Sequence, residues 1–379
     1  MPRAYLDHAS TTAPRPEAVA ALVRWTTLAA ADPGRIHEEG RVVRDALEED
    51  RTHVASLVGA TPRQVIFTSG GTEAINAAVW GATRRHPGAP VLYANVEHSA
   101  VRDASDRLAP TEVLPVDGAA RVDIAALATR LQDSRLPRPA LVHCQWANHE
   151  VGTLQPLHEV VALCRAADVL VHVDAAAACG HVAMAFDDLG ADLMSISAHK
   201  LGGVPGSGAL IVRRGLRLEP LIVGGEQERA RRGGLEAVPA HLAFGAAALA
   251  LSGGTLADEA AAARTQVAAL IDRATAVEGV RVVGPTEPVE RLPYLVCLGV
   301  DGVEAEPVLI GLDRAGVAVH SGSACASESI EPSPVLEAMG VDPSHSLRLS
   351  VGWPTTDDDV AAFAAAFAGV VEGLRSLRG

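Results

Sequence analysis

The sequence predicts an α/β protein with a mostly parallel sheet covered by helices, followed by a smaller α+β region. Between residues 64 and 212, short apolar runs that end in Gly, Ser, Asn or His alternate with helical stretches, which is typical of such a sheet. The chain is 48% hydrophobic but only 3% aromatic. Its core must therefore consist mainly of Val, Leu, Ile and Ala, as the core around buried parallel strands does.

Six apolar runs are expected to form strands of this sheet. In chain order they are QVIFTSGG (64–71), VLYANVEHS (91–99), ALVHCQWANHE (140–150), VLVHVDAAA (169–177), DLMSISAHK (192–200) and GALIVRR (208–214). In sheets of this kind, ligands bind beyond the carboxyl ends of the strands. Polar residues collect at those ends, at 69–72, 97–98, 148–150, 174 and 197–200, so we expect the functional site there.

After about residue 253 the pattern changes. A helix is expected over 255–277, strands over 280–284, 294–300 and 317–322, and a closing helix from Asp357. Two Ala-rich segments, near 240–251 and 360–368, favour helix by composition. We therefore expect a large domain over 15–252 and a small α+β domain that combines 1–14 with 253–379.

The net charge and the short length of the apolar stretches argue against several functions. The formal net charge is −14, and the basic residues are scattered apart from RARR at 229–232, so direct binding to nucleic acid is not expected. The start, MPRAYLDHASTTAP, contains no apolar stretch of signal-peptide length, and the apolar runs are interrupted by charge or proline. We expect a soluble, cytoplasmic protein without membrane contact.

The five cysteines, at positions 144, 164, 179, 297 and 325, show no CxxC spacing. Their odd number in a chain of 379 residues argues against a disulfide framework or a structural zinc site. Each cysteine is then either a small buried hydrophobic residue or a reactive thiol.

Asp174 and Lys200 form the strongest pair of candidate site residues, because each ends an apolar run in successive βα units. A carboxylate at a strand end can pair with a protonated ring nitrogen, and a neighbouring lysine can form a Schiff base. These are the two anchors that pyridoxal phosphate requires. A surface salt bridge would use the same two residues. The small residues of SAHKLGGVPGSG (197–208) favour the cofactor, because they leave the lysine beside an open backbone.

The segment TSGGTEAIN (68–76) follows an expected strand and opens a helix. The amides of Gly71 and Thr72 and the Thr72 hydroxyl could hold a phosphate there, although a plain turn with a capping threonine looks the same. His98 ends another strand, where it could stack on a ring or transfer protons. It could equally be an ordinary polar residue at a strand end.

Eight motifs together carry a resemblance to a known family. They are YLDHASTTAP, IFTSGGTEAIN, VEHSAV, NHEVGT, HVDAAAACG, DLMSISAHKLGG, SGSACASESIEPSPVLEAMG and LRLSVG. In order and spacing they resemble the motifs of the cysteine desulfurases of the class V aminotransferase fold, in the branch that includes NifS and IscS. The resemblance covers nearly the whole chain.

The resemblance implies a pyridoxal phosphate enzyme of fold type I with a seven-stranded sheet in its large domain. It also implies a homodimer that converts L-cysteine to L-alanine and passes the sulfur, as a persulfide on a loop cysteine, to an acceptor protein. The pathway stays open between iron–sulfur assembly and a dedicated thiolation pathway such as DNA phosphorothioation or tRNA thiolation.

The roles of individual residues follow from the resemblance. Lys200 is similar to the Schiff-base lysine, Asp174 to the partner of the pyridinium nitrogen, and His98 to the stacked acid/base histidine, which could carry the substrate thiol proton. Cys325 is similar to the persulfide carrier. The further cofactor contacts that the resemblance implies are Gly71, Thr72, His149, Ser197 and His199, and the substrate contacts are Arg348 and Asn148.

Cys325 suits that role by its surroundings. It lies in HSGSACASES (320–329), where glycine and serine supply little side chain to hold the loop in place. A thiol that takes sulfur at a buried cofactor and then presents it to another protein needs such a segment. A free thiol in an idle loop is the alternative.

Four positions depart from the family pattern. His149 and Ala177 replace an asparagine and a glutamine that contact the cofactor, Leu235 replaces a threonine that reaches the partner subunit's phosphate, and Asp32 replaces an asparagine. Each lost hydrogen bond is worth about 0.5–1.5 kcal/mol, so we expect weaker cofactor retention or slower turnover.

Two other functions remain open at this point. A selenocysteine lyase, or another class V lyase or transaminase, would need Lys200 but not Cys325. A non-enzymatic sulfur carrier or scaffold would need no cofactor at all.

Overall fold

A seven-stranded sheet forms the centre of the computed structural model, which describes residues 3–28, 31–321 and 332–377. Its order is β2-β8-β7-β6-β5-β3-β4. The strands are β2 (Val65–Thr68), β3 (Val91–Ala94), β4 (Thr111–Leu114), β5 (Leu141–His143), β6 (Leu170–Asp174), β7 (Leu193–Ser197) and β8 (Gly208–Val212). All neighbours pair in parallel except β8, which is antiparallel to both β7 and β2. The expected mostly parallel, seven-stranded sheet is confirmed.

The strand β4 was not indicated by the apolar pattern. Its sequence is Thr-Glu-Val-Leu, and Val113 is 52% exposed. Because β4 pairs only with β3 at one edge of the sheet, it needs no continuous apolar run. Each of the six apolar runs contains one of the other strands.

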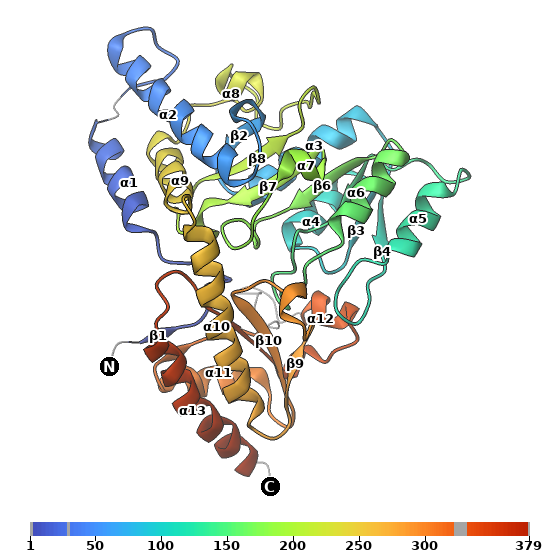
Figure 1. Ribbon diagram of the computed structural model, residues 1–379. Coiled ribbons are helices and arrows are strands. Elements are labelled where there is room, and N and C mark those ends of the chain that lie inside the picture. The colour runs from blue at the N-terminus through green and yellow to red at the C-terminus, as the bar shows by residue number, and fades with distance from the viewer. Residues whose placement is uncertain (1–2, 29–30, 322–331, 378–379) are drawn as a thin grey trace.

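Helices cover both faces of the sheet (Figure 1). They are α1 (Pro16–Leu28), α2 (Glu38–Leu57), α3 (Gly71–Arg85), α4 (Ser99–Leu108), α5 (Ile124–Gln132), α6 (Leu157–Ala166), α7 (Phe186–Leu189), α8 (Gln227–Ala230) and α9 (Val238–Ala250), with the 3-10 turns η1 (Pro62–Gln64) and η2 (Ala198–Lys200). Successive strand residues point to opposite faces. Leu193 belongs to one core cluster with residues of α3 and α4, whereas Met194 belongs to another with residues of α2, α6 and α9. Because both faces are buried, the strands are apolar throughout.

A buried ion pair connects β2 to the segment that contains α8. The Glu228 carboxylate accepts hydrogen bonds from both terminal nitrogens of Arg51, at 2.6 and 2.8 Å, and from the Phe67 amide at 2.9 Å. Glu228 and the two residues after it have φ between 48° and 60°, a conformation that costs energy for residues other than glycine. The ion pair holds this turn against the end of the sheet.

The second region contains two smaller sheets, in the lower part of Figure 1. An antiparallel sheet has the order β12-β10-β9, and β1 pairs in parallel with β11. The elements are β1 (Ala4–Tyr5), β9 (Val280–Val283), β10 (Leu295–Val300), β11 (Val317–Ala318), β12 (Ser346–Ser350), α10 (Thr255–Thr275), α11 (Ala305–Arg314), α12 (Pro334–Ala338) and α13 (Asp357–Ser376), with the 3-10 turns η3 (Pro288–Glu290) and η5 (Pro343–His345). The helices expected over the two Ala-rich segments are present as α9 and α13. The domain boundaries at residues 14 and 252 stay a prediction.

Three further features bear on the sequence-based expectations. The four cysteines that the structure describes are buried and free, and the described residues contain no group of three or more His, Cys, Asp or Glu placed to hold a metal. No single described helix is long and apolar enough to cross a membrane, while α9 and α10 together pass that test by length and composition with a bend of 76°.

Candidate active site

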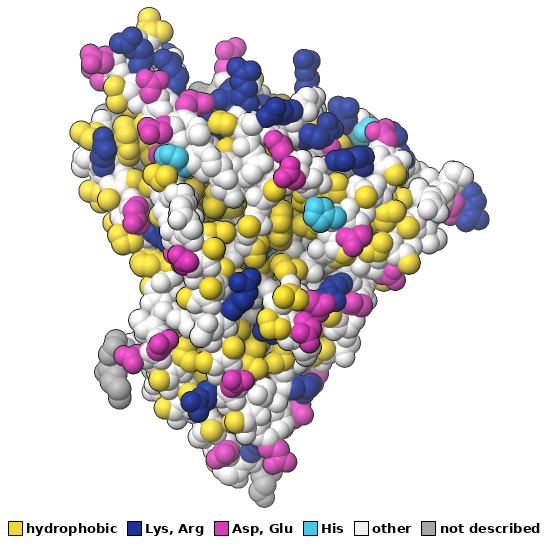
Figure 2. Space-filling model, viewed as in Figure 1, with side chains coloured by type: hydrophobic (Ala, Val, Ile, Leu, Met, Phe, Trp, Pro, Cys, Tyr) yellow, Lys and Arg dark blue, Asp and Glu magenta, His cyan; other side chains and the backbone are white. Residues whose placement is uncertain are grey.

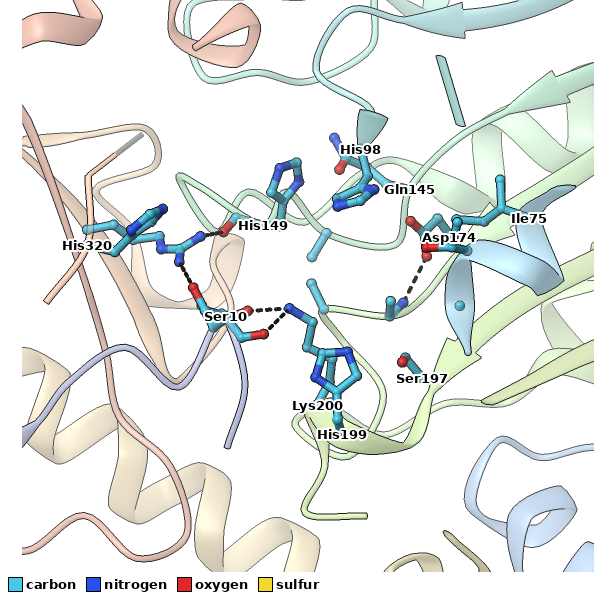
Figure 3. A pocket seen from close by; sticks show the side chains of 17 residues that line it. Ser10, Ile75, His98, Gln145, His149, Asp174, Ser197, His199, Lys200 and His320 are labelled. Atoms are coloured by element: carbon cyan, nitrogen blue, oxygen red, sulfur yellow. Dashed lines mark hydrogen bonds between the residues drawn. The ribbon is translucent and has the colours of Figure 1, made fainter. Parts of the chain in front are cut away.

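A cavity of about 410 Å³ opens at the carboxyl ends of β6 and β7. Most of the predicted site residues line it, namely Gly71, Thr72, His98, His149, Asp174, Ser197, His199, Lys200 and Arg348. Figure 3 shows Asp174 at one end of the cavity and His320 at the other, with His98 and His149 along one wall and Lys200 and His199 along the facing wall. Residues from distant parts of the chain therefore meet in one place.

Asp174 is fixed by the pairing of its own strand. The register of β6 and β7 places Asp174 opposite Ser195. One carboxylate oxygen, Oδ1, accepts hydrogen bonds from the Ser195 hydroxyl at 3.1 Å and from the Ala176 amide at 3.0 Å. The side chain is 8% exposed, so the carboxylate faces the cavity from a fixed position.

Lys200 ends the 3-10 turn that follows β7. Its Nζ donates hydrogen bonds to the carbonyl oxygens of Ala9, at 2.5 Å, and Ser10, at 2.8 Å. Behind it, the His181 ring lies 3.1 Å from the Lys200 carbonyl oxygen and stacks on Tyr294 with centroids 3.9 Å apart. The N-terminal segment and this aromatic pair thus hold the lysine from two sides.

The side of the cavity that carries Ser197 also contains the start of α3, whose free amides could hold an anion, and we call it the anion-binding end. Gly71 and Thr72 form the first turn of α3, whose amides have no partner within the helix. A Cβ atom at position 71 would lie 3.4 Å from the Ser197 Cβ, so a glycine keeps this space open. Glu73 stabilises the turn, since its carboxylate accepts from the Ser69 amide at 2.8 Å and from Arg232 at 2.9 Å.

The approach of β8 to this turn also requires a glycine. A Cβ atom on Gly208 would lie 2.6 Å from the backbone carbon of Gly70. No side chain can be accommodated at that distance. The glycine therefore allows the turn and the end of β8 to pack directly together. The close approach of β8 to the start of α3 therefore depends on the glycine at position 208.

Arg348 reaches the cavity from β12. Its Nη1 donates to the His149 carbonyl oxygen at 3.0 Å, and its Nη2 donates to Asp7 at 2.8 Å and to the Ser10 hydroxyl at 2.7 Å. Its Nε is buried and has no hydrogen-bond partner within the described part of the chain. A guanidinium held in this way can present its remaining donor capacity to a carboxylate.

Burial and positive neighbours keep the histidines of the cavity neutral. Burial, Arg348 and Lys200 lower the pKa of His320 to about 4, and burial with Lys200 lowers the pKa of His199 to about 4. Burial also lowers the pKa of His98. The pKa of His149 lies well below its ordinary value, because of burial, His98, Arg348 and Lys200.

Two buried carboxyl groups stand behind the cavity wall. Burial and the neighbouring Asp174 raise the pKa of Glu97 to about 8, and its Oε2 has no hydrogen-bond partner among the described residues. Burial raises the pKa of Glu150 to about 7, and the Ser333 hydroxyl donates to its Oε2 at 2.5 Å.

Two predicted site residues do not line this cavity as described. Asn148 is fully buried, its amide donates to the Val96 carbonyl, and its oxygen accepts from the amides of Glu150 and Val151. It holds the turn that carries His149. Cys325 lies outside the described residues.

Three polar lining residues were not identified from the sequence. They are Ser10, Gln145 and His320. Ser10 lies within the first of the eight motifs, but its position beside Lys200 depends on how the N-terminal segment crosses the cavity. No spacing along the chain indicates that contact.

The residues fit pyridoxal phosphate. An amine and a buried carboxylate face one cavity, and a helix start with a hydroxyl and an imidazole lies at its anion-binding end. The fold and this site together define the class of protein, a layered α/β enzyme of the type that binds this cofactor through a lysine.

Comparison with known proteins agrees with this class. The aminotransferase class-V family profile matches residues 4–363. A cysteine desulfurase from Cereibacter sphaeroides is 38% identical over 100% of this chain and 98% of its own length. Cysteine desulfurase IscS 1 from Archaeoglobus fulgidus is 34% identical over 98% of both proteins.

Solved structures show the same fold. A NifS-like protein superposes with a TM-score of 0.89 at 26% identity and covers 98% of this chain and 100% of its own. SspA in complex with cysteine superposes with a TM-score of 0.79 at 25% identity and covers 92% of this chain and 98% of its own. The chain belongs to the cysteine desulfurases of the aminotransferase class-V family, a family of pyridoxal phosphate enzymes.

Replacement of Glu97 by glutamine should remove a pH-dependent part of the stability. The folded protein keeps the Glu97 proton up to about pH 8, whereas the unfolded chain releases it near pH 4.5. Between these values the wild type loses stability as the pH rises, by up to about 1.4 kcal/mol per pH unit. The variant lacks this contribution, so the free energy of unfolding of E97Q minus that of the wild type should increase as the pH rises.

Urea unfolding at several pH values, with pyridoxal phosphate in excess, measures this difference. The exposed Glu278, replaced by glutamine, is the control and should leave the slope unchanged. Parallel curves for the wild type and E97Q would contradict a protonated, buried Glu97.

Proposed function

We propose that this protein is a cysteine desulfurase that takes sulfur from L-cysteine with the help of pyridoxal phosphate. The observation that carries the proposal is the meeting of Lys200, Asp174 and Arg348 in one cavity. Relatives of 33–38% identity over 98–100% of the chain carry the cysteine desulfurase name, and the similar SspA structure contains cysteine.

In this proposal the cavity binds the cofactor at three points. Lys200 would hold it covalently, Asp174 would pair with its ring nitrogen, and the start of α3 with Ser197 and His199 would receive its phosphate. His98 would contact it from the cavity wall. When bound, pyridoxal phosphate withdraws electrons from the amino acid attached to it and so weakens the bonds at Cα and Cβ.

Arg348 is the proposed binding group for the substrate carboxylate. Its contacts with Asp7, Ser10 and the His149 carbonyl fix the guanidinium plane, so the substrate meets a positioned donor rather than a mobile one. Such positioning reduces the entropy that binding would otherwise cost. With the substrate bound, the Lys200 amine would be the group that can accept the Cα proton.

The sulfur transfer balances without another reactant. L-cysteine and the Cys325 thiol give L-alanine and a Cys325 persulfide. The S–Cβ bond breaks, an S–S bond forms, and Cβ gains one hydrogen, so each of the two sulfur atoms is oxidised by one electron while Cβ takes up two. Cys325 then passes its outer sulfur to an acceptor protein, in the cytoplasm and without direct contact with nucleic acid.

Replacement of Cys325 by serine should stop sulfur transfer without removing the cofactor. A serine hydroxyl cannot attack sulfur to form a persulfide, while Lys200 and Asp174 remain in place. The purified variant should stay yellow with pyridoxal phosphate but release no more sulfide from L-cysteine and a reductant than a protein-free control does.

The matched control is Lys200→Ala, which should lose the covalently bound chromophore as well. Sulfide release by C325S at the wild-type rate would indicate a lyase that does not need the thiol. A wild-type protein that binds no pyridoxal phosphate would indicate a non-enzymatic carrier.

We also propose that the protein is a homodimer. Large apolar side chains are exposed on α1, where Val23 is 59% and Leu28 66% exposed, and on nearby loops, where Ile36 is 91%, Val223 75% and Leu235 62% exposed. Figure 2 shows hydrophobic side chains gathered over α1 and α9 on the left of that face. Exposed apolar side chains of this kind favour self-association.

An aspartate in place of Leu235 should weaken this dimer. Burial of a charge in an apolar interface is costly, so we expect the dissociation constant to rise at least about tenfold, which corresponds to about 1.4 kcal/mol. Sedimentation velocity over a range of concentrations measures the change. Val289→Asp, on η3 and 84% exposed, is the control, and a wild type that sediments as a monomer would contradict the proposal.

A further inference from the structure

The two imidazoles of the cavity wall differ in which nitrogen is available. The rings of His98 and His149 lie with centroids 5.3 Å apart at 65°, and both line the cavity. Both are held neutral, as described above. A neutral imidazole has one N–H donor and one acceptor nitrogen, so the contacts of each ring decide whether it can take up a proton.

The acceptor nitrogen of His98 is already in use. His98 is the N-cap of α4, and its Nδ1 accepts a hydrogen bond from the Ala100 amide at 3.1 Å. The ring hydrogen of neutral His98 must therefore be on Nε2, which is then a donor. His98 can stack and donate, but it has no lone pair left for a thiol proton unless the cap of α4 is broken.

His149 has the opposite arrangement. None of the described residues hydrogen-bonds to its ring nitrogens. Oε1 of Glu150 lies 3.7 Å from Nε2, a distance too long for a hydrogen bond. Figure 3 shows the ring projecting into the cavity beside His98. Its backbone is fixed at the same time, because its carbonyl oxygen accepts from Arg348.

The surroundings of His149 suit a base that is charged only briefly. Burial together with Arg348 and Lys200 keeps the ring unprotonated before reaction. When the ring takes up a proton, the Glu150 carboxyl group is the adjacent group that can stabilise the positive charge, and the Ser333 hydroxyl holds that carboxyl group in place. His149, the Glu150 carboxyl group and the Ser333 hydroxyl are therefore placed for this role.

We propose that His149, and not His98, is the base that takes up the thiol proton during sulfur transfer and returns it to Cβ of the product. The assignment rests on the proposed function. Two thiols react and one persulfide S–H remains, so one thiol proton must leave sulfur. Cβ must gain a proton, because the electron pair of the broken S–Cβ bond moves to carbon. His149 carries that proton between the two atoms.

His149 stands at a position where the family that the sequence resembles has an asparagine, which cannot take up a proton at neutral pH. In this protein the histidine at position 149 adds a second imidazole to the cavity, while the first one, His98, caps α4.

The test replaces His149 by alanine and adds imidazole. Loss of a general base lowers kcat by about 10²–10⁴-fold, so H149A should form alanine from L-cysteine at a rate reduced by that factor. The cofactor absorbance, and its change on addition of L-cysteine, should persist. Free imidazole should then restore alanine formation in a saturable manner, at least about tenfold. His158→Asn, on the exposed face of α6, is the control and should match the wild type with or without imidazole.

Other outcomes would overturn the assignment. If H149A keeps kcat within about threefold of the wild type, or if imidazole does not rescue it, His149 is not the carrier. If H149A does not hold the cofactor, His149→Asn decides, because asparagine preserves polarity and approximate size: a retained absorbance with a lost kcat supports the assignment, and an unchanged kcat refutes it. A wild type that forms no alanine would instead refute the proposed function.

Discussion

The parallel pairing of β6 with β7 is the constraint on which the site depends. Its register places Asp174 opposite Ser195, and β7 runs directly into the 3-10 turn that ends at Lys200. A carboxylate and an amine that lie 26 residues apart in sequence thereby reach the same edge of the sheet. A slip of one residue would turn Asp174 to the other face, so the apolar pattern that fixes the register also fixes the chemistry.

The cost of burying charge explains why so many contacts support the site. Polar groups removed from water need compensating hydrogen bonds, and those of Lys200 and Arg348 come largely from residues 7–10. This segment follows β1, which pairs with β11 in the second region. The N-terminal segment therefore joins the smaller sheets to the cavity, and a change in its path would alter both the lysine and the proposed carboxylate-binding arginine.

Much of the fold could be predicted from the sequence because strands buried on both faces leave a clear apolar signal. The same logic placed Asp174, Lys200 and His98 at one edge. The edge strand β4 left no such signal, since Thr111 and Glu112 face partly toward solvent. Contacts that depend on tertiary path, such as the Ser10 carbonyl at Lys200, could not be inferred from spacing.

Residue type alone also misjudged the turn after β5. Asn148 and His149 are adjacent in sequence, and both were expected at the site. The structure commits the Asn148 amide to backbone groups and leaves the His149 ring in the cavity. Only their hydrogen-bond partners show which of the two side chains is available in the cavity. In the same way, the hydrogen bond from the Ala100 amide distinguishes His98 from His149.

The central claim is that the amine of Lys200 holds pyridoxal phosphate in this cavity. Reduction of the protein with borohydride in the presence of the cofactor, followed by peptide mass spectrometry, locates the attachment directly. We expect a phosphopyridoxyl group on the peptide that contains Lys200, which is the sole lysine of the chain. Reduced protein without that group, or with the group at the N-terminal amine instead, would contradict it.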